Sequence, residues 1–293
     1  MPSAPEVTRI SLKNILFPTD FSQSSNAALP FASALARIYG STILMTHVVA
    51  PEPHLRVVLD RLPAQDDIPA LEAKQKLTEL MEDPSLRGIN CKFAVEQGEL
   101  GEVVSEIIRD RQVDLVVLGT HGHRGFSKLV LGSGAEQIYR AAPCPVLTIG
   151  PKSHKSEDWK LRRILCPVDV AEDPAPVLGY ALALAEENQA EIVILEAIPL
   201  VPWQHRSLVE ERSHRSLQDL IPAHAADWCT PQLMVRWEHP AEAILQTAAE
   251  RDIDLIVMSV HRARAFALSS HLPWPIASEV VSRAQCPVLT LRI

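Results

Sequence analysis

The chain repeats itself once, and this duplication limits what it can fold into more than any other feature. Three segments of the first half recur in the same order in the second half: 14–20 matches 163–169, 110–121 matches 250–261, and 142–149 matches 284–291. Ordered matches of this kind indicate two copies of one structural unit. We therefore expect two domains, at 1–150 and 161–293, joined by a polar linker at 151–160.

Within each copy, short apolar runs alternate with stretches of helical periodicity. The run Leu115–Leu118 is apolar throughout, which is typical of a strand covered on both faces of a parallel sheet. Alternating strands and helices predict βαβ units with right-handed crossovers. We expect strands at these positions in the first and then the second copy: 14–18, 42–49, 91–96, 115–119 and 146–149, followed by 163–168, 190–197, 233–238, 255–259 and 288–291.

The helical stretches and their connections contain informative prolines. We expect Pro30 to kink the first helix, because proline cannot donate the helical hydrogen bond. The proline-containing segment 51–69 is expected to be a long loop, and the basic segment 199–215 a solvated loop and helix. The helices expected in the first copy are 24–39, 68–82, 101–111 and 133–140.

The charge balance of the chain is acidic, with a formal net charge of −8 and an isoelectric point of about 5.8. This balance argues against a broad surface for nucleic acids or anionic membranes. No run approaches the roughly 20 apolar residues that span a bilayer, and the polar N-terminus lacks a signal-peptide core. We therefore expect a cytoplasmic protein with neither a nucleic acid nor a membrane as partner.

The cysteines and histidines do not form a recognisable reactive or metal-binding pattern. Five cysteines without a CxxC spacing do not make a disulfide framework. Cys144 and Cys286 lie in matching CPVLT strings and are expected to be small core residues. The eleven histidines show no HxxxH or HExxH spacing, and no serine lies in a GxSxG elbow. We assign no metal ligands and no catalytic residues.

A glycine-bearing segment follows the fourth expected strand of the first copy and leads into a helix. Glycine has no Cβ, so the backbone of such a segment can lie against a phosphate chain. Gly132 and Ser133 open the helix, and the free N–H groups at a helix N-terminus favour an anion. The Ser133 hydroxyl could bind the ligand or cap the helix. By spacing alone, a purely structural turn fits the segment equally well.

The first expected strand ends in Pro18-Thr19-Asp20. Asp20 could accept hydrogen bonds from an adenine or a sugar, or it could be the N-cap of the following helix. Two familiar nucleotide loops do not fit the chain. There is no GxxxxGK[ST] sequence, and the glycines follow a late strand rather than the first.

The second copy keeps Pro167-Val168-Asp169 but not the glycines. Ser259 stands at the position of Gly119 and Arg262 at that of Gly122, and the loop is about two residues longer. Side chains there should block a close approach of the backbone to a nucleotide. An alternative is that His261, Arg262 and Arg264 bind another anion. We also expect strand 287–291 to pair with 145–149, so that the copies pack as an intramolecular pseudo-dimer.

With these motifs the sequence resembles the universal stress protein family in its tandem form, over 12–150 and 161–293. ATP-binding members of that family carry G-x2-G-x9-G-[ST], which 119–133 matches in full, although Gly134 departs from the β-branched residue that often follows. The resemblance implies two Rossmann-like, adenine nucleotide alpha hydrolase-like α/β domains, each a five-stranded parallel sheet flanked by helices. It also implies ATP, with or without Mg²⁺, bound by Pro18, Thr19, Asp20, Val48, Leu118, Gly119, His121, Gly122, Gly132 and Ser133.

Three functions follow as hypotheses. The first is a regulatory stress-response protein that binds one adenine nucleotide in the first domain and acts on an unknown protein partner, with a homodimer as an option. The second is a slow ATP hydrolase, in which Asp20 and His121 orient a water molecule. The third is a ligand-free scaffold or chaperone-like stress protein, in which the glycine segment is only structural.

Overall fold

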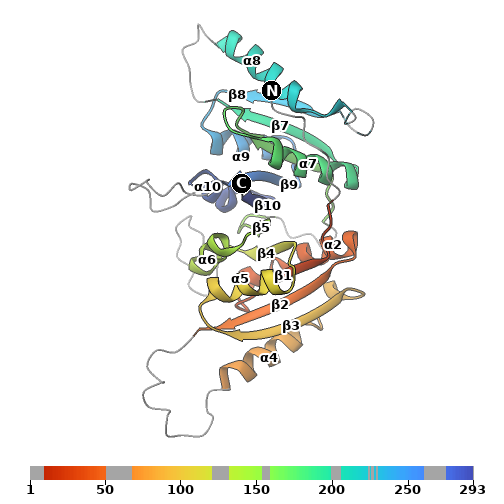
Figure 1. Ribbon diagram of the computed structural model, residues 1–293, viewed down its shortest axis with the longest axis vertical. Helices are drawn as coiled ribbons and strands as arrows, with labels where there is room; N and C mark the ends of the chain where they lie inside the picture. The colour runs from red at the N-terminus through yellow and green to blue at the C-terminus, as the bar shows by residue number, and fades with distance from the viewer. Residues whose placement is uncertain are drawn as a thin grey trace. The chain divides into compact units, whose positions relative to one another are not determined.

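The computed structural model describes residues 10–50, 68–120, 132–153, 159–198, 206–223, 225, 228, 230–260 and 275–292. These residues divide into two compact units. One is Ser11–Leu147; the other comprises the residues from Trp159 onward together with Ile10 and 148–153. Figure 1 shows that each copy of the repeat contains its own group of strands with flanking helices.

The first copy contains five strands in the order β3-β2-β1-β4-β5. The pairs β1–β2, β1–β4 and β2–β3 are parallel. The central residues of β1 are fully buried, as predicted for a strand covered on both faces. The strands are β1 (Asn14–Pro18), β2 (Thr42–Val49), β3 (Asn90–Gln97), β4 (Leu115–Gly119) and β5 (Val146–Ile149).

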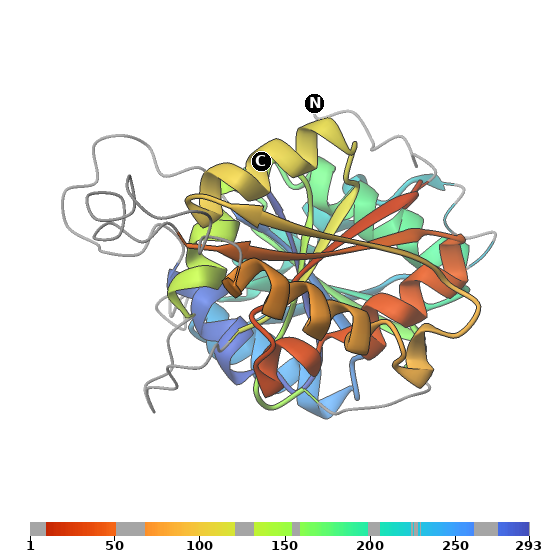
Figure 2. The same ribbon diagram turned by 90° about the horizontal axis from the view of Figure 1, so that it is seen from below.

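Helices cover both faces of this sheet. Figure 2 shows α2 and α4, in red and orange, on one side of the strands and α5, in yellow, on the other. This is the layering that βαβ crossovers produce. The helices are α1 (Gln23–Asn26), α2 (Leu29–Tyr39), α4 (Ile68–Leu80), α5 (Leu100–Asp110) and α6 (Ser133–Ala141), with a 3₁₀ turn at Pro84–Leu86.

The single helix expected at 24–39 is two helices, α1 and α2, separated by two residues. Pro30 is the second residue of α2. The prediction of a kink at Pro30 was therefore wrong in detail. A proline in the first turn of a helix loses no hydrogen bond, since those N–H groups have no partner within the helix. The break precedes the proline instead of bending the helix at it.

The second copy repeats this plan with the strand order β10-β9-β6-β7-β8, in which all four neighbouring pairs are parallel. The central residues of its strand β6, at 164–166, are fully buried, like those of β1. The strands are β6 (Arg163–Val168), β7 (Glu191–Ala197), β8 (Gln232–Arg236), β9 (Leu255–Val260) and β10 (Val288–Arg292). The helices are α7 (Ala175–Asn188), α8 (Arg206–Leu220), α9 (Pro240–Glu250) and α10 (Pro275–Arg283).

One aspartate clamps the amino edge of each sheet. The Asp114 carboxylate, just before β4, accepts the backbone N–H groups of Lys13 and Asn14 at 2.7 and 2.9 Å. Asp254, just before β9, accepts the N–H groups of Arg162 and Arg163, both at 2.9 Å. Both copies therefore fix the start of the central strand pair with the same contact. We call these two contacts the amino-edge clamps.

The matching cysteines pack as expected of small core residues, with Cys286 buried and Cys144 half-buried. Burial raises the pKa of each thiol to about 12. Both are therefore protonated at neutral pH and unreactive. Among the described helices, none is long and apolar enough to cross a membrane.

Candidate functional site

The strand order of the first copy reverses between β1 and β4. The chain runs outward from β1 through β2 and β3 and then returns to β4 on the other side of β1. Ligands of open α/β sheets bind beyond the carboxyl ends of the strands at such a point. The residues that follow these strand ends are Thr19 and Asp20 after β1 and Thr120 after β4.

Most of the predicted site residues lie at this carboxyl edge. Pro18 ends β1, Leu118 and Gly119 end β4, and Val48 is the second-last residue of β2. Gly132 and Ser133 open α6. Of the predicted set, His121 and Gly122 lie outside the described residues.

A hydrogen bond brings the start of α6 to the end of β4. The Gly132 N–H donates to the carbonyl oxygen of Thr120 at 2.8 Å. Gly132 is the N-cap, and no side-chain cap hydrogen bond is found there in the described part of the chain. The interpretation of Ser133 as a capping residue was therefore wrong, because Ser133 is already the first helical residue. A nine-residue helix without a side-chain cap thus begins at the switch point, the arrangement that suits an anion.

Gly119 has a packing reason to be glycine. A Cβ at this position would lie 2.2 Å from the carbonyl oxygen of Ser24 and 2.7 Å from its carbonyl carbon. The end of β4 therefore packs directly on the backbone of α1. The sequence left the glycine segment open between a phosphate site and a structural turn, but it did not predict this contact, since nothing in the sequence shows that α1 lies against Gly119.

The turn after β1 holds Asp20 in place. One carboxylate oxygen of Asp20 accepts the N–H of Ser22 at 3.0 Å. The Ser22 hydroxyl in turn accepts the N–H of Ser25 at 3.1 Å and is the N-cap of α1. The alternative interpretation of Asp20 as the N-cap was therefore wrong. Its carboxylate instead closes the tight turn that leads into the N-cap Ser22.

Thr19 is buried and uses its polar atoms to support this turn. Its N–H donates to the carbonyl oxygen of Thr46 at 2.9 Å. Its hydroxyl oxygen accepts the N–H of Phe21 and the hydroxyl of Ser25, both at 3.0 Å. Its carbonyl oxygen lies 2.8 Å from Nδ1 of His47. Thr19 therefore connects β1, β2 and α1 at the edge of the site.

Sequence reasoning missed two residues of this edge, His47 and Phe21. Their ring centroids are 4.7 Å apart, and Nζ of Lys76 on α4 lies 5.5 Å from the Phe21 centroid. His47 could have been found from its position in the sequence, because it directly precedes Val48 at the end of a strand next to β1. The contact itself depends on the path of the turn, which the sequence does not reveal.

The second copy presents a different carboxyl edge. Asp169 still closes its turn, accepting the N–H of Ala171 at 2.9 Å. However, α10 begins with Pro275 where α6 begins with Ser133, so the first helical N–H is missing. The segment with Arg262 lies outside the described residues.

Glu196 takes the place of His47 in the second copy, since β7 pairs with β6 in the register that β2 has with β1. Its side chain is 7% exposed, and one carboxyl oxygen has no hydrogen-bond partner among the described residues. Burial raises the pKa of Glu196, and a hydrogen bond with Ser213 partly opposes this change. The edge therefore carries a buried acid where the first copy has an imidazole donor.

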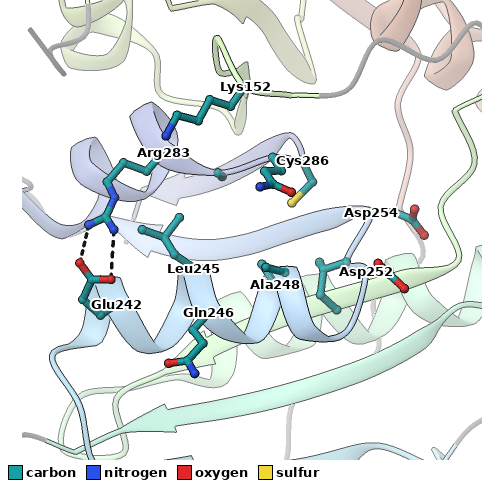
Figure 3. A pocket seen from close by; sticks show the side chains of 13 residues that line it. Lys152, Glu242, Leu245, Gln246, Ala248, Asp252, Asp254, Arg283 and Cys286 are labelled. Atoms are coloured by element: carbon teal, nitrogen blue, oxygen red, sulfur yellow. Dashed lines mark hydrogen bonds and ion pairs between the residues drawn. The ribbon is translucent and has the colours of Figure 1, made fainter.

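A hollow of about 520 Å³ lies elsewhere in the second unit, where α9 and α10 border the amino ends of β9 and β10 (Figure 3). Arg283 joins Glu242 across it with hydrogen bonds of 2.6 and 3.0 Å. Asp254, at its far side, belongs to the amino-edge clamp. These polar groups already have protein partners, and the hollow lies at the opposite edge of the sheet from Asp169.

The described residues contain no group of three or more His, Cys, Asp or Glu side chains that could hold a metal ion. The carboxyl edge of the first copy therefore offers hydrogen-bond donors and one turn-bound carboxylate, within the ranges that the structure covers.

Comparison with known proteins agrees with this architecture. Universal stress protein MJ0577 of Methanocaldococcus jannaschii is 24% identical over 159 residues, covering 49% of this chain and 98% of that protein. A universal stress protein of Mycolicibacterium smegmatis is 21% identical over 293 residues, covering 95% and 96%. The crystal structure of a universal stress protein from Archaeoglobus fulgidus has a TM-score of 0.70 at 18% identity, covering 97% and 99%.

The family model of the Universal stress protein family matches the chain twice, at residues 11–150 and 160–292. The two matches correspond to the two copies of the repeat and include both carboxyl edges. The chain, with two tandem α/β copies that each contain parallel strands, belongs to the universal stress protein family.

Proposed function

We propose that this chain is a regulatory stress-response protein that binds one ATP molecule at the carboxyl edge of its first copy. The observation that carries the proposal is the hydrogen bond from Gly132 to Thr120, which brings the N-terminus of α6 to the switch point. Backbone N–H groups without a side-chain cap would meet the phosphates there. Asp20, across the same edge, would accept hydrogen bonds from the ribose or the base.

The remaining site residues have roles that follow from their places. The backbone at Val48 would contact the adenine, and Pro18 and Thr19 would shape the adjacent wall. Leu118 and Gly119, at the end of β4, would form the floor of the site. His121, Gly122 and Ser133 are expected to complete the phosphate site. Mg²⁺ would be held mainly by the phosphates, since we assign it no protein ligand.

The second copy is proposed not to bind a nucleotide in this manner. Pro275 removes an N–H group from the start of α10. Glu196 places a buried acid on the side of the edge that corresponds to the proposed adenine contact at Val48. Nucleotide occupancy of the first copy alone would then alter the fit of the chain to a protein partner.

Titration calorimetry of the full chain with ATP, with and without Mg²⁺, tests this proposal. We expect one ATP per chain, and ADP and AMP titrations rank the contribution of each phosphate. The variant Gly122→Arg introduces the residue of the second copy and should abolish binding. An absence of ATP binding by the wild-type chain would overturn the proposal. A stoichiometry of two would overturn the assignment of the second copy.

Mass spectrometry of small molecules released from the freshly purified chain provides an independent measurement. A retained adenine nucleotide, present in the wild type and lost in Gly122→Arg, would support the site. Release of phosphate from ATP above a no-protein control would instead favour the slow hydrolase, so the same samples are assayed for turnover.

A further inference from the structure

The contact between His47 and Thr19 has a defined direction. Nδ1 of His47 lies 2.8 Å from the carbonyl oxygen of Thr19. A carbonyl oxygen only accepts hydrogen bonds, so Nδ1 must carry the hydrogen and donate. A neutral His47 is therefore the Nδ1–H tautomer. This side chain on β2 thus holds the last backbone carbonyl before Asp20.

The same imidazole also contacts the residue after Asp20. Its ring centroid is 4.7 Å from that of Phe21, with an angle of 30° between the ring planes. Phe21 has a φ of 61°, in the left-handed region that bulky residues rarely adopt. Such a conformation is strained for a bulky residue and persists only where the surroundings hold it. His47, the Thr19 hydroxyl and Lys76 are those surroundings.

Asp20 is therefore held from both sides by one side chain. Thr19 precedes it and Phe21 follows it, and His47 contacts both. The direction of the Asp20 carboxylate depends on the backbone at these two neighbours. If either contact is lost, the turn can relax toward a commoner conformation and the carboxylate turns with it.

The second copy shows what the edge is like without this arrangement. Glu196, Val168 and Val170 stand where the first copy has His47, Thr19 and Phe21. An ionised carboxylate cannot donate to a carbonyl, and valine has no hydroxyl to receive an N–H. All three members of the arrangement differ together, although Asp169 keeps its own turn.

We propose that His47 is a positioning residue of the nucleotide site, which sets the direction of Asp20 through the Thr19 carbonyl and the Phe21 ring. The inference rests on the proposed function, because it assigns His47 a role in nucleotide affinity. It extends that function by attributing part of the nucleotide affinity to a side chain that does not itself contact the nucleotide.

Two variants separate the donor from the ring. His47→Asn keeps an N–H donor close to the place of Nδ1, whereas His47→Phe keeps an aromatic ring and loses the donor. We expect His47→Phe to weaken ATP binding about 10-fold, as for the loss of one hydrogen bond. His47→Asn should recover at least half of that loss on a logarithmic scale. His239→Phe, at the start of α9 in the second copy, is the matched control and should leave ATP affinity unchanged.

Calorimetry and ¹⁵N NMR of the imidazoles distinguish the outcomes. The nucleotide-free wild type should show His47 with a protonated Nδ1. Equal ATP affinity in the wild type and both His47 variants would overturn the inference while leaving the proposed function intact, even if the variants melt at lower temperature. A protonated Nε2 with a bare Nδ1 would also overturn it. A wild type that binds no ATP would remove the proposed function and the inference together.

Discussion

In the first copy α6 begins with Ser133 beside the end of β4, whereas in the second copy the matching helix α10 begins with Pro275. Near the end of the strand beside the central one, the first copy has His47 on β2 and the second copy has Glu196 on β7. Their amino edges, in contrast, carry the same clamp. The comparison teaches that the residues that anchor the sheet and the residues at its carboxyl edge can vary independently, since the carboxyl edges of the two copies differ while their amino edges are the same.

Exchanging residues between the copies tests that separation. The largest effect is expected for Gly119→Ser, which introduces the residue found at 259. The new side chain would overlap the Ser24 backbone, with its Cβ 2.2 Å from the carbonyl oxygen. We expect a loss of about 3 kcal/mol in the free energy of unfolding, measured by urea denaturation. Unchanged unfolding would show that α1 moves aside easily and that Gly119 has no packing role.

The second exchange is Ser133→Pro. Proline is tolerated at the first position of a helix, and α10 already has one there. The fold should therefore persist, but ATP affinity should fall about 10- to 100-fold, because one N–H group to an anion is lost. Calorimetry measures the affinity and circular dichroism checks the fold. The reciprocal change Pro275→Ser is the control and should add no second ATP site. An unaltered ATP affinity of Ser133→Pro would show that the phosphates do not bind at the N-terminus of α6.

The third change is Glu196→Gln, which removes the buried acid of the second copy. Burial raises the folded-state pKa of Glu196 above its ordinary value of 4.5. The folded state therefore binds the proton more tightly, and the wild type loses stability as pH rises from that value through the folded pKa. We expect the variant to gain stability relative to wild type across this window, by about 1.4 kcal/mol for each pH unit between the ordinary and the folded pKa. Melting temperatures from pH 4 to 8, for both proteins, measure it. Melting temperatures of the wild type and the variant that change in parallel with pH would contradict a raised pKa for Glu196.

The smallest effect is expected for Gly101→Ala, which introduces the residue at 241 in the matching helix α9. A Cβ at this position would lie 3.8 Å from its nearest neighbours, in ordinary contact with Ala141. Alanine in a helix should therefore stabilise the first copy by about 0.5–1 kcal/mol. Urea denaturation of Gly101→Ala and Gly119→Ser in parallel compares their free energies of unfolding. A destabilised Gly101→Ala would mean that α5 and α6 pack more tightly than this distance indicates.

Much of the fold could be predicted from the sequence, because buried strands and amphipathic helices have periodic patterns. The bounds of β1, β2, β4 and β5 were predicted correctly. The strand expected at 91–96 is one residue longer at each end. The pattern of apolar residues determines where a strand lies but not where its last hydrogen bond forms.

The site was less predictable, because its residues act through contacts between distant segments. The helix after β1 was expected as one piece, and its cap is Ser22 instead of Asp20. Gly119 shows a second limit, since its crowding by Ser24 arises only when β4 and α1 meet. His47 shows a third, because its contact with Phe21 depends on a left-handed backbone that no pattern in the sequence indicates.

The amino-edge clamps have a consequence for engineering this chain. Asp114 and Asp254 each fix the start of a central strand by two backbone hydrogen bonds, so each sheet has an anchor that no ligand residue shares. We therefore expect that segments at the carboxyl edge of one copy can be transplanted into the other while this anchor stays intact. With the proposed ATP site in the first copy only, such a chain would suit a biosensor in which the first half responds to the nucleotide and the second half serves as a reference.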